Sequence, residues 1–327
     1  MQTFESFDRE LYPSNDTAFE EIALRLFRFQ AEHNTVYRQY LAYIAVDARD
    51  VTRLEQIPFL PISLFKTHEI KTGDWQPEVV YTSSGTTGAT TSQHLVKSKE
   101  FYLAHSRRIF ESVYGPLADF HVLCLLPSYL ERTGSSLVAM ASHFIEVSQS
   151  VHSGFFLRDL DRLVAVLESI KDNRRILLLG VSFALLDLAE QYELDLSRCI
   201  IMETGGMKGR RKEITRAELH EILKKNFNVP VIHSEYGMTE LLSQAYSKGE
   251  GLYACPPAMR VILRELNDPF STSHPDSGVI NVIDLANAHS CAFIETQDLG
   301  KSGQGGHFEV LGRMDASDAR GCNLLAE

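Results

Sequence analysis

The spacing of the hydrophobic residues changes twice along the chain. From about residue 16 to 46, apolar side chains such as Phe19, Ile22 and Leu26 recur every three or four positions, which predicts helices. Farther on, short apolar runs alternate with amphipathic stretches, which is typical of buried parallel strands linked by helices. Beyond about residue 250, short β-rich runs separated by turn residues predict a small antiparallel sheet or barrel.

The expected elements follow directly from this pattern. Strands are expected at 78–81, 120–127, 174–180, 199–203, 229–234, 259–263, 278–283 and 292–296. Helices are expected near 60–66, 100–113, 159–171, 182–193 and 210–227. The pattern divides the chain into a helical N-terminal segment at 1–57, an α/β core at 58–250 and a β-rich subdomain at 251–327. The predicted fold class is α/β, with mainly parallel sheets flanked by helices.

Composition excludes several classes of protein. The 327 residues, 44% hydrophobic and 23% charged, are typical of a globular protein of one large domain or two ordinary ones. A net charge of −11 argues against a nucleic-acid partner, which needs a basic face. No apolar run approaches the ~20 residues that span a bilayer, and no signal-peptide pattern is present. Five widely separated cysteines favour reduced thiols in the cytoplasm over disulfides or a zinc site.

A loop rich in hydroxyl groups follows the strand expected at 78–81. Its residues are Ser83, Ser84, Gly85, Thr86, Thr87 and Gly88. The glycines let the backbone turn tightly, and the hydroxyls and backbone N–H groups together can cradle an anion such as phosphate. The loop lacks the lysine of a Walker motif. A flexible linker is the ordinary alternative, but linkers rarely follow an apolar strand directly.

A second motif, Tyr236-Gly237-Met238-Thr239-Glu240, follows the strand expected at 229–234. Tyr236 offers a flat ring for stacking, and Thr239 offers a hydroxyl for a phosphate oxygen. Glu240 offers a carboxylate for a divalent cation. The ordinary alternative is a strand-to-helix turn with Thr239 or Glu240 near a helix cap.

Two other residues have both a chemical and a structural interpretation. Asp298, which precedes Gly300, could accept hydrogen bonds from sugar hydroxyls or could shape a turn. Ser182 lies in Gly180-Val181-Ser182-Phe183-Ala184, which approximates the nucleophile elbow of hydrolases with Ala184 where glycine is expected. Asp298 and His307 follow in the chain order of hydrolases, but a helix cap formed by Ser182 is the simpler interpretation.

Over about residues 58–327 the chain resembles the adenylate-forming (acyl-activating) superfamily. The loop at 83–88 resembles its phosphate loop, and 236–240 is similar to its aromatic-Gly-x-Thr-Glu motif. Gly312-Arg313-Met314-Asp315 is similar to its Gly-Arg-x-Asp motif, and Asp298 falls at the position of its ribose-binding aspartate. Chain size and the stretches 126–132, 135–137 and 320–322 are most similar to the acyl-protein synthetases of bacterial luminescence operons, followed by the phenylacetate-CoA ligases.

The resemblance implies a large domain of the adenylate-forming type with a small C-terminal β-barrel-like part. It also implies ATP and Mg²⁺ as cofactors, with CoA as one candidate acceptor. The loop at 83–88 would hold the ATP phosphates, and Glu240 would hold the magnesium ion. Tyr236 and Thr239 would surround the adenine and the α-phosphate.

The resemblance implies roles for four further residues. Asp298 and Arg313 would hold the ribose, and Gly205 and Gly206 would line the adenine pocket. The chain also departs from the family pattern. Thr90 and Thr91 stand where a Pro-Lys pair usually closes the first loop, and Ala316 replaces the second aspartate of the hinge motif. Because the sequence ends at Glu327, we expect the mobile C-terminal lid to be absent.

Cys322 is a candidate acyl acceptor. Arg320 lies two residues before it, and a nearby guanidinium favours the thiolate, the form that attacks an acyl-adenylate. The resemblance implies an acceptor cysteine near the C-terminus. The alternative is that Cys322 packs as a small apolar side chain.

Together these features predict an ATP-dependent ligase that converts a fatty or aryl carboxylic acid to an acyl-adenylate and transfers the acyl group to a thiol. Its catalytic residues would be Thr239, Glu240 and Cys322. The acceptor is Cys322, CoA, a carrier protein, or an acyl-reductase or acyl-transferase partner. Two other functions stay open: a serine hydrolase using Ser182, and a nucleotide- or acyl-binding module without turnover.

Overall fold

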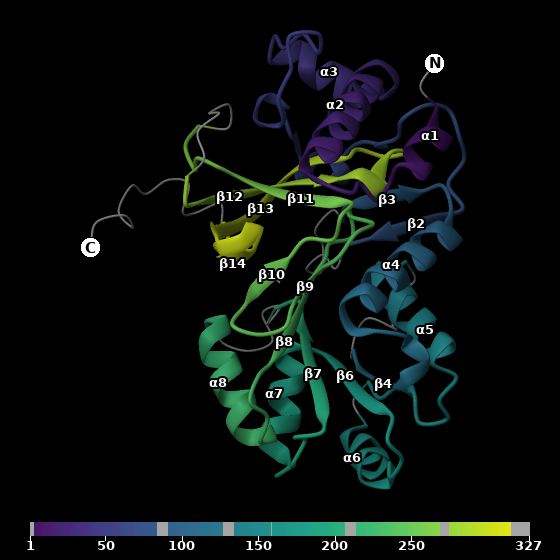
Figure 1. The fold of residues 1–327 in the computed structure, drawn as a ribbon, viewed down its shortest axis with the longest axis vertical. Coiled ribbons are helices and arrows are strands. Elements are labelled where there is room, and N and C mark those ends of the chain that lie inside the picture. Colours follow the sequence, from purple (N-terminus) through teal and green to yellow (C-terminus); the bar gives the residue numbers. More distant parts are fainter. Residues whose placement is uncertain are drawn as a thin grey trace, which may run out of the picture. The chain divides into compact units, whose positions relative to one another are not determined.

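The computed structural model describes residues 3–83, 91–126, 134–157, 159–206, 214–268 and 275–314 (Figure 1). Two compact units share the chain: Met1–Asp74 together with Pro257–Glu327, and Trp75–Pro256. Among the described residues no helix has both the length and the apolar composition needed to cross a membrane. The domain boundaries expected after residues 57 and 250 stay predictions from the sequence.

The unit Trp75–Pro256 is built on a largely parallel sheet with the order β10-β9-β8-β7-β6-β4-β5. Its parallel strands are β4 (Phe120–Leu125), β5 (Gly154–Phe155), β6 (Arg175–Val181), β7 (Cys199–Thr204) and β8 (His233–Tyr236). The antiparallel strands β9 (Ala245–Ser247) and β10 (Leu252–Ala254) extend the sheet beyond β8. Every residue of β4 is buried, as its continuous apolar run predicts for a strand covered on both faces.

Helices flank this sheet. They are α4 (Lys99–Tyr114), α5 (Ser136–Ser148), α6 (Leu160–Ser169), α7 (Ser182–Gln191) and α8 (Arg216–Phe227), with a 3-10 turn at Leu117–Asp119. The helix α7 packs on α8 and α4 packs on α5 (Figure 1). The side chains of Ser98, Ser135, Asp159 and Thr215 each accept a hydrogen bond from the first turn of the helix that follows. The predicted α/β class is therefore confirmed.

Three details differ from the sequence prediction. A strand, β3 (Gln93–Val96), pairs antiparallel with β2 (Val79–Thr82) before α4 begins, where a helix was expected directly after the predicted loop. The sequence does not predict α5, because two of its buried positions hold serine and weaken the apolar spacing. The strand expected at 229–234 begins only at His233, since the Val229 N–H bonds the Lys224 carbonyl at the end of α8.

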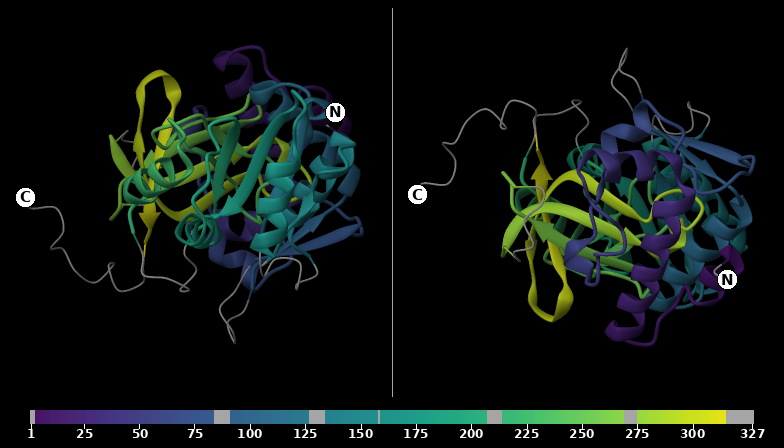
Figure 2. Two further views of the ribbon diagram at one scale, coloured as in Figure 1. Left: turned by 90° about the horizontal axis from the view of Figure 1, so that it is seen from below. Right: turned by 90° about the horizontal axis from the view of Figure 1, so that it is seen from above.

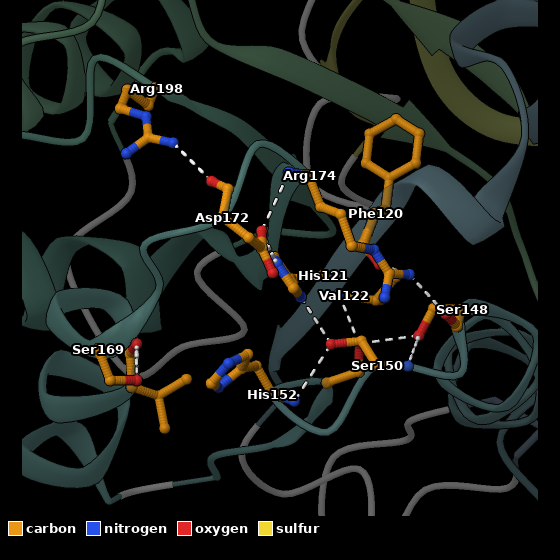
Figure 3. Close-up of polar contacts among 12 residues, drawn as sticks. Phe120, His121, Val122, Ser148, Ser150, His152, Ser169, Asp172, Arg174 and Arg198 are labelled. Atoms are coloured by element: carbon orange, nitrogen blue, oxygen red, sulfur yellow. Dashed lines mark hydrogen bonds and ion pairs between the residues drawn. The ribbon is translucent and has the colours of Figure 1, made fainter.

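A polar cluster holds the amino end of β4 in place (Figure 3). His121 Nδ1 lies 2.6 Å from Ser150 Oγ, and His121 Nε2 lies 2.9 Å from Asp172 Oδ1. The Arg174 guanidinium donates to the carbonyls of Phe120 and Ser148, at 2.8 and 2.5 Å. The cluster ties β4 to the loops after α5 and before β6, at the edge of the sheet opposite to the carboxyl ends of its parallel strands.

The other unit combines N-terminal helices with an antiparallel sheet. The helices are α1 (Phe4–Arg9), α2 (Asp16–His33) and α3 (Thr35–Tyr43), with 3-10 turns at Leu54–Gln56, Ile62–Lys66, Leu285–Asn287 and Gln304–Gly306. The strands β11 (Met259–Arg264), β12 (Ser277–Asp284), β13 (Phe293–Ser302) and β14 (Phe308–Arg313) pair antiparallel in that order, and β1 (Leu60–Pro61) runs parallel to β13. The predicted N-terminal helices and the predicted antiparallel sheet are confirmed.

Gln30 joins α2 to the segment that links β12 to β13, and Figure 2 shows the purple N-terminal helices beside the yellow-green strands of this unit. Its amide nitrogen donates to the carbonyls of Asn287 and Ala288, each at 3.0 Å, and its amide oxygen accepts from Ala292 N at 2.9 Å. Gln30 is fully buried. These bonds satisfy backbone groups that a purely apolar residue would leave without partners.

We therefore predict that Gln30→Ala lowers the free energy of unfolding by about 3 kcal/mol, because several buried polar groups lose their partner at once. Glu21→Ala, at an exposed position of the same helix, is the matched control and should change stability little. Urea unfolding followed by fluorescence measures both effects. Equal midpoints for the two variants would contradict this role of Gln30.

Candidate active site

Two loops of the unit Trp75–Pro256 leave the same edge of its sheet. Gly205 and Gly206 follow β7, and Tyr236 ends β8. Because Thr204 on β7 is in register with Glu235 on β8, the two loops begin side by side. Gly205 has φ +69°, a conformation that suits glycine. Both glycines are exposed, and a Cβ at Gly206 would meet no atom of the described residues within 4 Å. The carboxyl edge of a parallel sheet is where such folds bind ligands.

Glu203, near the end of β7, carries a buried charge. The Arg216 Nε atom lies 3.0 Å from Glu203 Oε1, and His220 Nε2 lies 3.6 Å from the same oxygen. Ser182 Oγ lies 3.3 Å from Glu203 Oε2. Burial by itself would raise the pKa of Glu203, but the hydrogen bond with His220 and the charge of Arg216 outweigh it and hold the pKa below its usual value. Glu203 therefore stays ionised at neutral pH.

Glu235, near the end of β8, is a buried carboxyl group of a different kind. Its Oε2 accepts a hydrogen bond from Thr204 Oγ1 at 2.5 Å. A Cβ at Gly237 would collide with Glu235 Oε1, so the carboxyl group packs directly against the backbone of the turn that follows β8. Burial, aided by the charge of Glu203 and only partly offset by Thr204, raises the pKa of Glu235 to about 7.

The turn that carries Thr239 and Glu240 is held from the β2–β3 hairpin. His94 Nδ1 lies 2.8 Å from the Thr239 carbonyl oxygen, so this nitrogen carries the proton that it donates. His94 pairs with Tyr81 across the hairpin. The phosphate loop predicted at 83–88 connects the two strands of this hairpin. The structure therefore brings the base of that loop to the turn of Thr239 and Glu240.

Glu240 is the predicted magnesium ligand, and its side chain is buried. Among the residues that the structure describes, no three His, Cys, Asp or Glu side chains converge as a metal site. Beside ATP, Mg²⁺ is usually held by one or two carboxylates together with phosphate oxygens. Glu240 could hold such an ion in the same manner, and its role stays a prediction.

Ser83 is the first residue of the predicted phosphate loop. Its N–H donates to the Ser92 carbonyl at 3.1 Å, and its Oγ accepts from Ser92 N at 2.9 Å, so this pair closes the base of the loop. Ser84, Gly85, Thr86, Thr87 and Gly88 lie outside the described residues, as does Cys322.

Asp298 and Arg313 belong to the unit that contains the antiparallel sheet. They lie directly opposite each other on β13 and β14, and their predicted ribose role stays a prediction. The Thr296 hydroxyl accepts from Asp298 N at 3.0 Å, and Met314 N donates to the Gln297 carbonyl at 2.7 Å. The two predicted ribose residues are thus neighbours.

Ser182 begins α7 and does not have the surroundings of a hydrolase nucleophile. Only 2% of its surface is exposed, and its hydroxyl lies 3.1 Å from the Gly205 carbonyl oxygen and 3.3 Å from a Glu203 carboxylate oxygen. The backbone carbonyl cannot take the proton of the hydroxyl, and the Glu203 carboxylate is already engaged by Arg216 and His220, so Ser182 lacks the poised base of an activated nucleophile.

Sequence reasoning assigned no role to His94, Glu203, Glu235 and Arg216. A signal for the two glutamates was present, because each is an acidic residue near the end of a buried strand, where a charge is costly without a partner. No comparable signal marked His94. It contacts Thr239 across 145 positions of sequence, and only the fold brings the two together.

Known proteins resemble this chain in sequence family and in fold. The family model described as "Acyl-protein synthetase, LuxE" matches residues 11–327. An open conformation of 2-hydroxyisobutyryl-CoA ligase in complex with 2-HIB-AMP and CoA has a TM-score of 0.67 and 13% identity, over 97% of this chain and 80% of the other. The resemblance to the adenylate-forming ligases is thereby confirmed. Among curated proteins no similar sequence is found.

Two ATP-bound structures are also similar in fold. MatB from Rhodopseudomonas palustris has a TM-score of 0.53 and 17% identity, and the match covers 72% of this chain and 47% of MatB. The RpMatB-BxBclM chimera B3 has a TM-score of 0.55 and 16% identity, over 74% of this chain and 49% of the chimera. The chain thus spans about half the length of these ligases. Identities this low show the fold alone.

The raised pKa of Glu235 predicts a pH-dependent stability. The unfolded group titrates near 4.5 and the folded group near 7, so the folded protein binds the proton more tightly. The contribution of this group to the free energy of unfolding is complete below pH 4.5 and is lost as the pH rises to 7. Relative to Glu235→Gln, the free energy of unfolding of wild type should fall by about 2 kcal/mol between pH 5 and 7.5. Denaturant unfolding at several pH values measures this difference.

The matched control for this measurement is Glu168→Gln, at an exposed position of α6. Its free energy of unfolding should depend on pH in the same way as that of wild type. If the stability difference between wild type and Glu235→Gln is independent of pH, the carboxyl group of Glu235 titrates in the ordinary range.

Proposed function

Because the chain belongs to the acyl-protein synthetase (LuxE) family, we propose that it uses ATP to activate a carboxylic acid and passes the acyl group to a thiol. In the first step a carboxylate oxygen bonds to the α-phosphorus, the bond from that phosphorus to the bridging oxygen breaks, and pyrophosphate leaves. In the second step a thiolate attacks the acyl carbon of the adenylate, and AMP leaves with the bonding electron pair.

The arrangement at the carboxyl edge of β7 and β8 is the observation that carries this proposal. The open backbone of Gly205 and Gly206 lies beside the Tyr236 turn, and the turn is tied through His94 to the base of the loop at 83–88. Backbone N–H groups and hydroxyls can orient a polyphosphate so that the carboxylate attacks in line. The catalytic work asked of these residues is positioning and neutralisation of charge.

Each predicted residue has a place in this reaction. Tyr236 and Gly205–Gly206 border the adenine, and Asp298 with Arg313 holds the ribose. Thr239 donates its hydroxyl to an α-phosphate oxygen. Glu240 would hold Mg²⁺, which neutralises charge on the phosphates when bound. The MatB structure and the chimera are both bound to ATP, which supports ATP as the nucleotide.

We propose a fatty or aryl acid as the substrate and a soluble cytoplasmic setting for the reaction. The acyl group goes first to Cys322 and then to an acyl-reductase or acyl-transferase partner. CoA, which the 2-hydroxyisobutyryl-CoA ligase structure contains, or a carrier protein is the alternative acceptor. A binding module without turnover is the second candidate function, and release of pyrophosphate separates it from an enzyme.

Replacing Glu240 tests the proposed magnesium site. Glu240→Gln keeps the shape of the side chain and removes its charge, so we expect pyrophosphate release to slow by about 10- to 100-fold. The magnesium concentration for half-maximal rate should also rise. Glu193→Gln, at an exposed position, is the control. Identical magnesium titrations of wild type and Glu240→Gln would remove Glu240 as the ligand.

Replacing Cys322 tests the proposed acceptor. Wild type incubated with ATP and a radiolabelled fatty acid, then denatured, should keep a label that hydroxylamine releases, as expected for a thioester. Cys322→Ser should form pyrophosphate but carry no such label. Cys199→Ser, at a partly buried cysteine on β7, is the control and should label like wild type. Equal labelling of wild type and Cys322→Ser would assign the acceptor role to another thiol.

A further inference from the structure

We propose that Ser182 orients the peptide group between Gly205 and Gly206 so that the Gly206 N–H donates a hydrogen bond to the adenine base. Glu203 in turn keeps the Ser182 hydroxyl in position. Ser182 is thus a positioning residue for nucleotide specificity, although it touches no substrate itself. The inference rests on the proposed function, because it needs the nucleotide to lie beside the two glycines.

The register of the sheet brings Ser182 to Gly205. Val181, the last residue of β6, is paired with Thr204, the last residue of β7. The residues that follow them, Ser182 and Gly205, therefore leave the sheet at the same edge. Ser182 Oγ lies 3.1 Å from the Gly205 carbonyl oxygen. The distance from Ser182 Oγ to Glu203 Oε2 is longer, 3.3 Å. The hydroxyl proton is thus shared between two acceptors, and the Gly205 carbonyl is the nearer one.

This bond sets the direction of the next N–H group. The described chain contains no cis peptide, and in a trans peptide the C=O and N–H bonds point in opposite directions. Since the Gly205 carbonyl points to Ser182, the Gly206 N–H points away from it. No described residue accepts a hydrogen bond from this N–H, and the space beside Gly206 is open. An exposed donor of fixed direction is therefore available to a ligand.

Glu203 keeps the serine in this orientation. Its carboxylate is held by Arg216 and His220, so it cannot turn away from Ser182 without leaving a buried charge unpaired. The Arg216 guanidinium also lies 5.3 Å from the centre of the Tyr253 ring, which restricts its movement. The two helices α7 and α8 thus join at one carboxylate beneath the Gly205–Gly206 backbone.

In the proposed arrangement the Gly206 N–H meets N1 of the base, and a backbone donor opposite N1 distinguishes purines. Adenine presents N1 as an acceptor, whereas hypoxanthine and guanine carry a hydrogen on N1 and cannot accept there. A site built around a fixed donor rejects the base that lacks the acceptor, because the polar groups of the site are then left unpaired. If Ser182 fixes the donor, its loss should relax the preference for adenine and leave the other contacts of the nucleotide unchanged.

The experiment compares ATP with ITP in wild type, Ser182→Ala and Ser234→Ala. Ser234 is the matched control, a buried serine on β8 whose Oγ lies 3.5 Å from His220 Nε2 in the same cluster and makes no bond to Gly205. Dissociation constants for both nucleotides are measured by equilibrium binding, and pyrophosphate release is measured separately. We expect Ser182→Ala to reduce the ratio of ITP to ATP dissociation constants about fivefold, the value of one ordinary hydrogen bond. Ser234→Ala should keep the wild-type ratio.

Three other outcomes overturn the inference. An unchanged ratio in Ser182→Ala shows that the serine does not position the donor. An equal fall in both variants assigns the effect to the integrity of the carboxylate cluster, and failure of wild type to bind ATP removes the site. If wild type binds ATP and discriminates against ITP but releases no pyrophosphate, the proposed reaction fails and the ratio still tests Ser182.

Discussion

Arg216 places its guanidinium 3.0 Å from the carboxylate of Glu203, which is 2% exposed, and the geometry of the candidate site depends on this pair. An ionised carboxyl group without a partner at that depth would cost several kcal/mol, and the end of β7 could not hold it. With Arg216 and His220 in place, the carboxylate supports Ser182, and Ser182 supports the backbone of Gly205. The ion pair therefore helps to fix the Gly205 backbone at the carboxyl edge of the sheet, through the contacts of Glu203 with Ser182 and of Ser182 with Gly205.

The second carboxyl group, Glu235, lies one strand away and has the opposite behaviour. Its partner is a hydroxyl donor, Thr204, and burial raises its pKa to about 7. One glutamate is thus kept ionised and the other is half protonated near neutral pH, because their surroundings push the two pKa values apart. Each packs under one of the two loops at the carboxyl edge, so the electrostatics of β7 and β8 fix the shape of the site.

Much of the parallel sheet could be predicted from the sequence, because β4, β6 and β7 are continuous apolar runs that leave little choice of structure. The prediction failed where local pattern competes with tertiary contacts. The strand β3 is four residues long and mixes Gln93 and His94 with Leu95 and Val96, so only its pairing with β2 defines it. The helical stretch expected over 16–46 is divided at Asn34, whose side chain caps α3 by accepting from Tyr37 N.

A family resemblance assigns candidate roles to matching positions. The sequence could therefore propose the motifs Tyr236–Glu240 and Gly205–Gly206 and the pair Asp298 and Arg313. The groups that hold them could not be found in this way, because contacts such as His94 with Thr239 join residues far apart in sequence. If this chain forms an acyl-adenylate as we propose, it should catalyse the exchange of radiolabelled pyrophosphate into ATP, because exchange requires the reversible first step and no acceptor. We expect exchange that depends on both an added carboxylic acid and the enzyme. Absence of exchange across fatty and aryl acids, from a folded protein that binds ATP, would contradict the account.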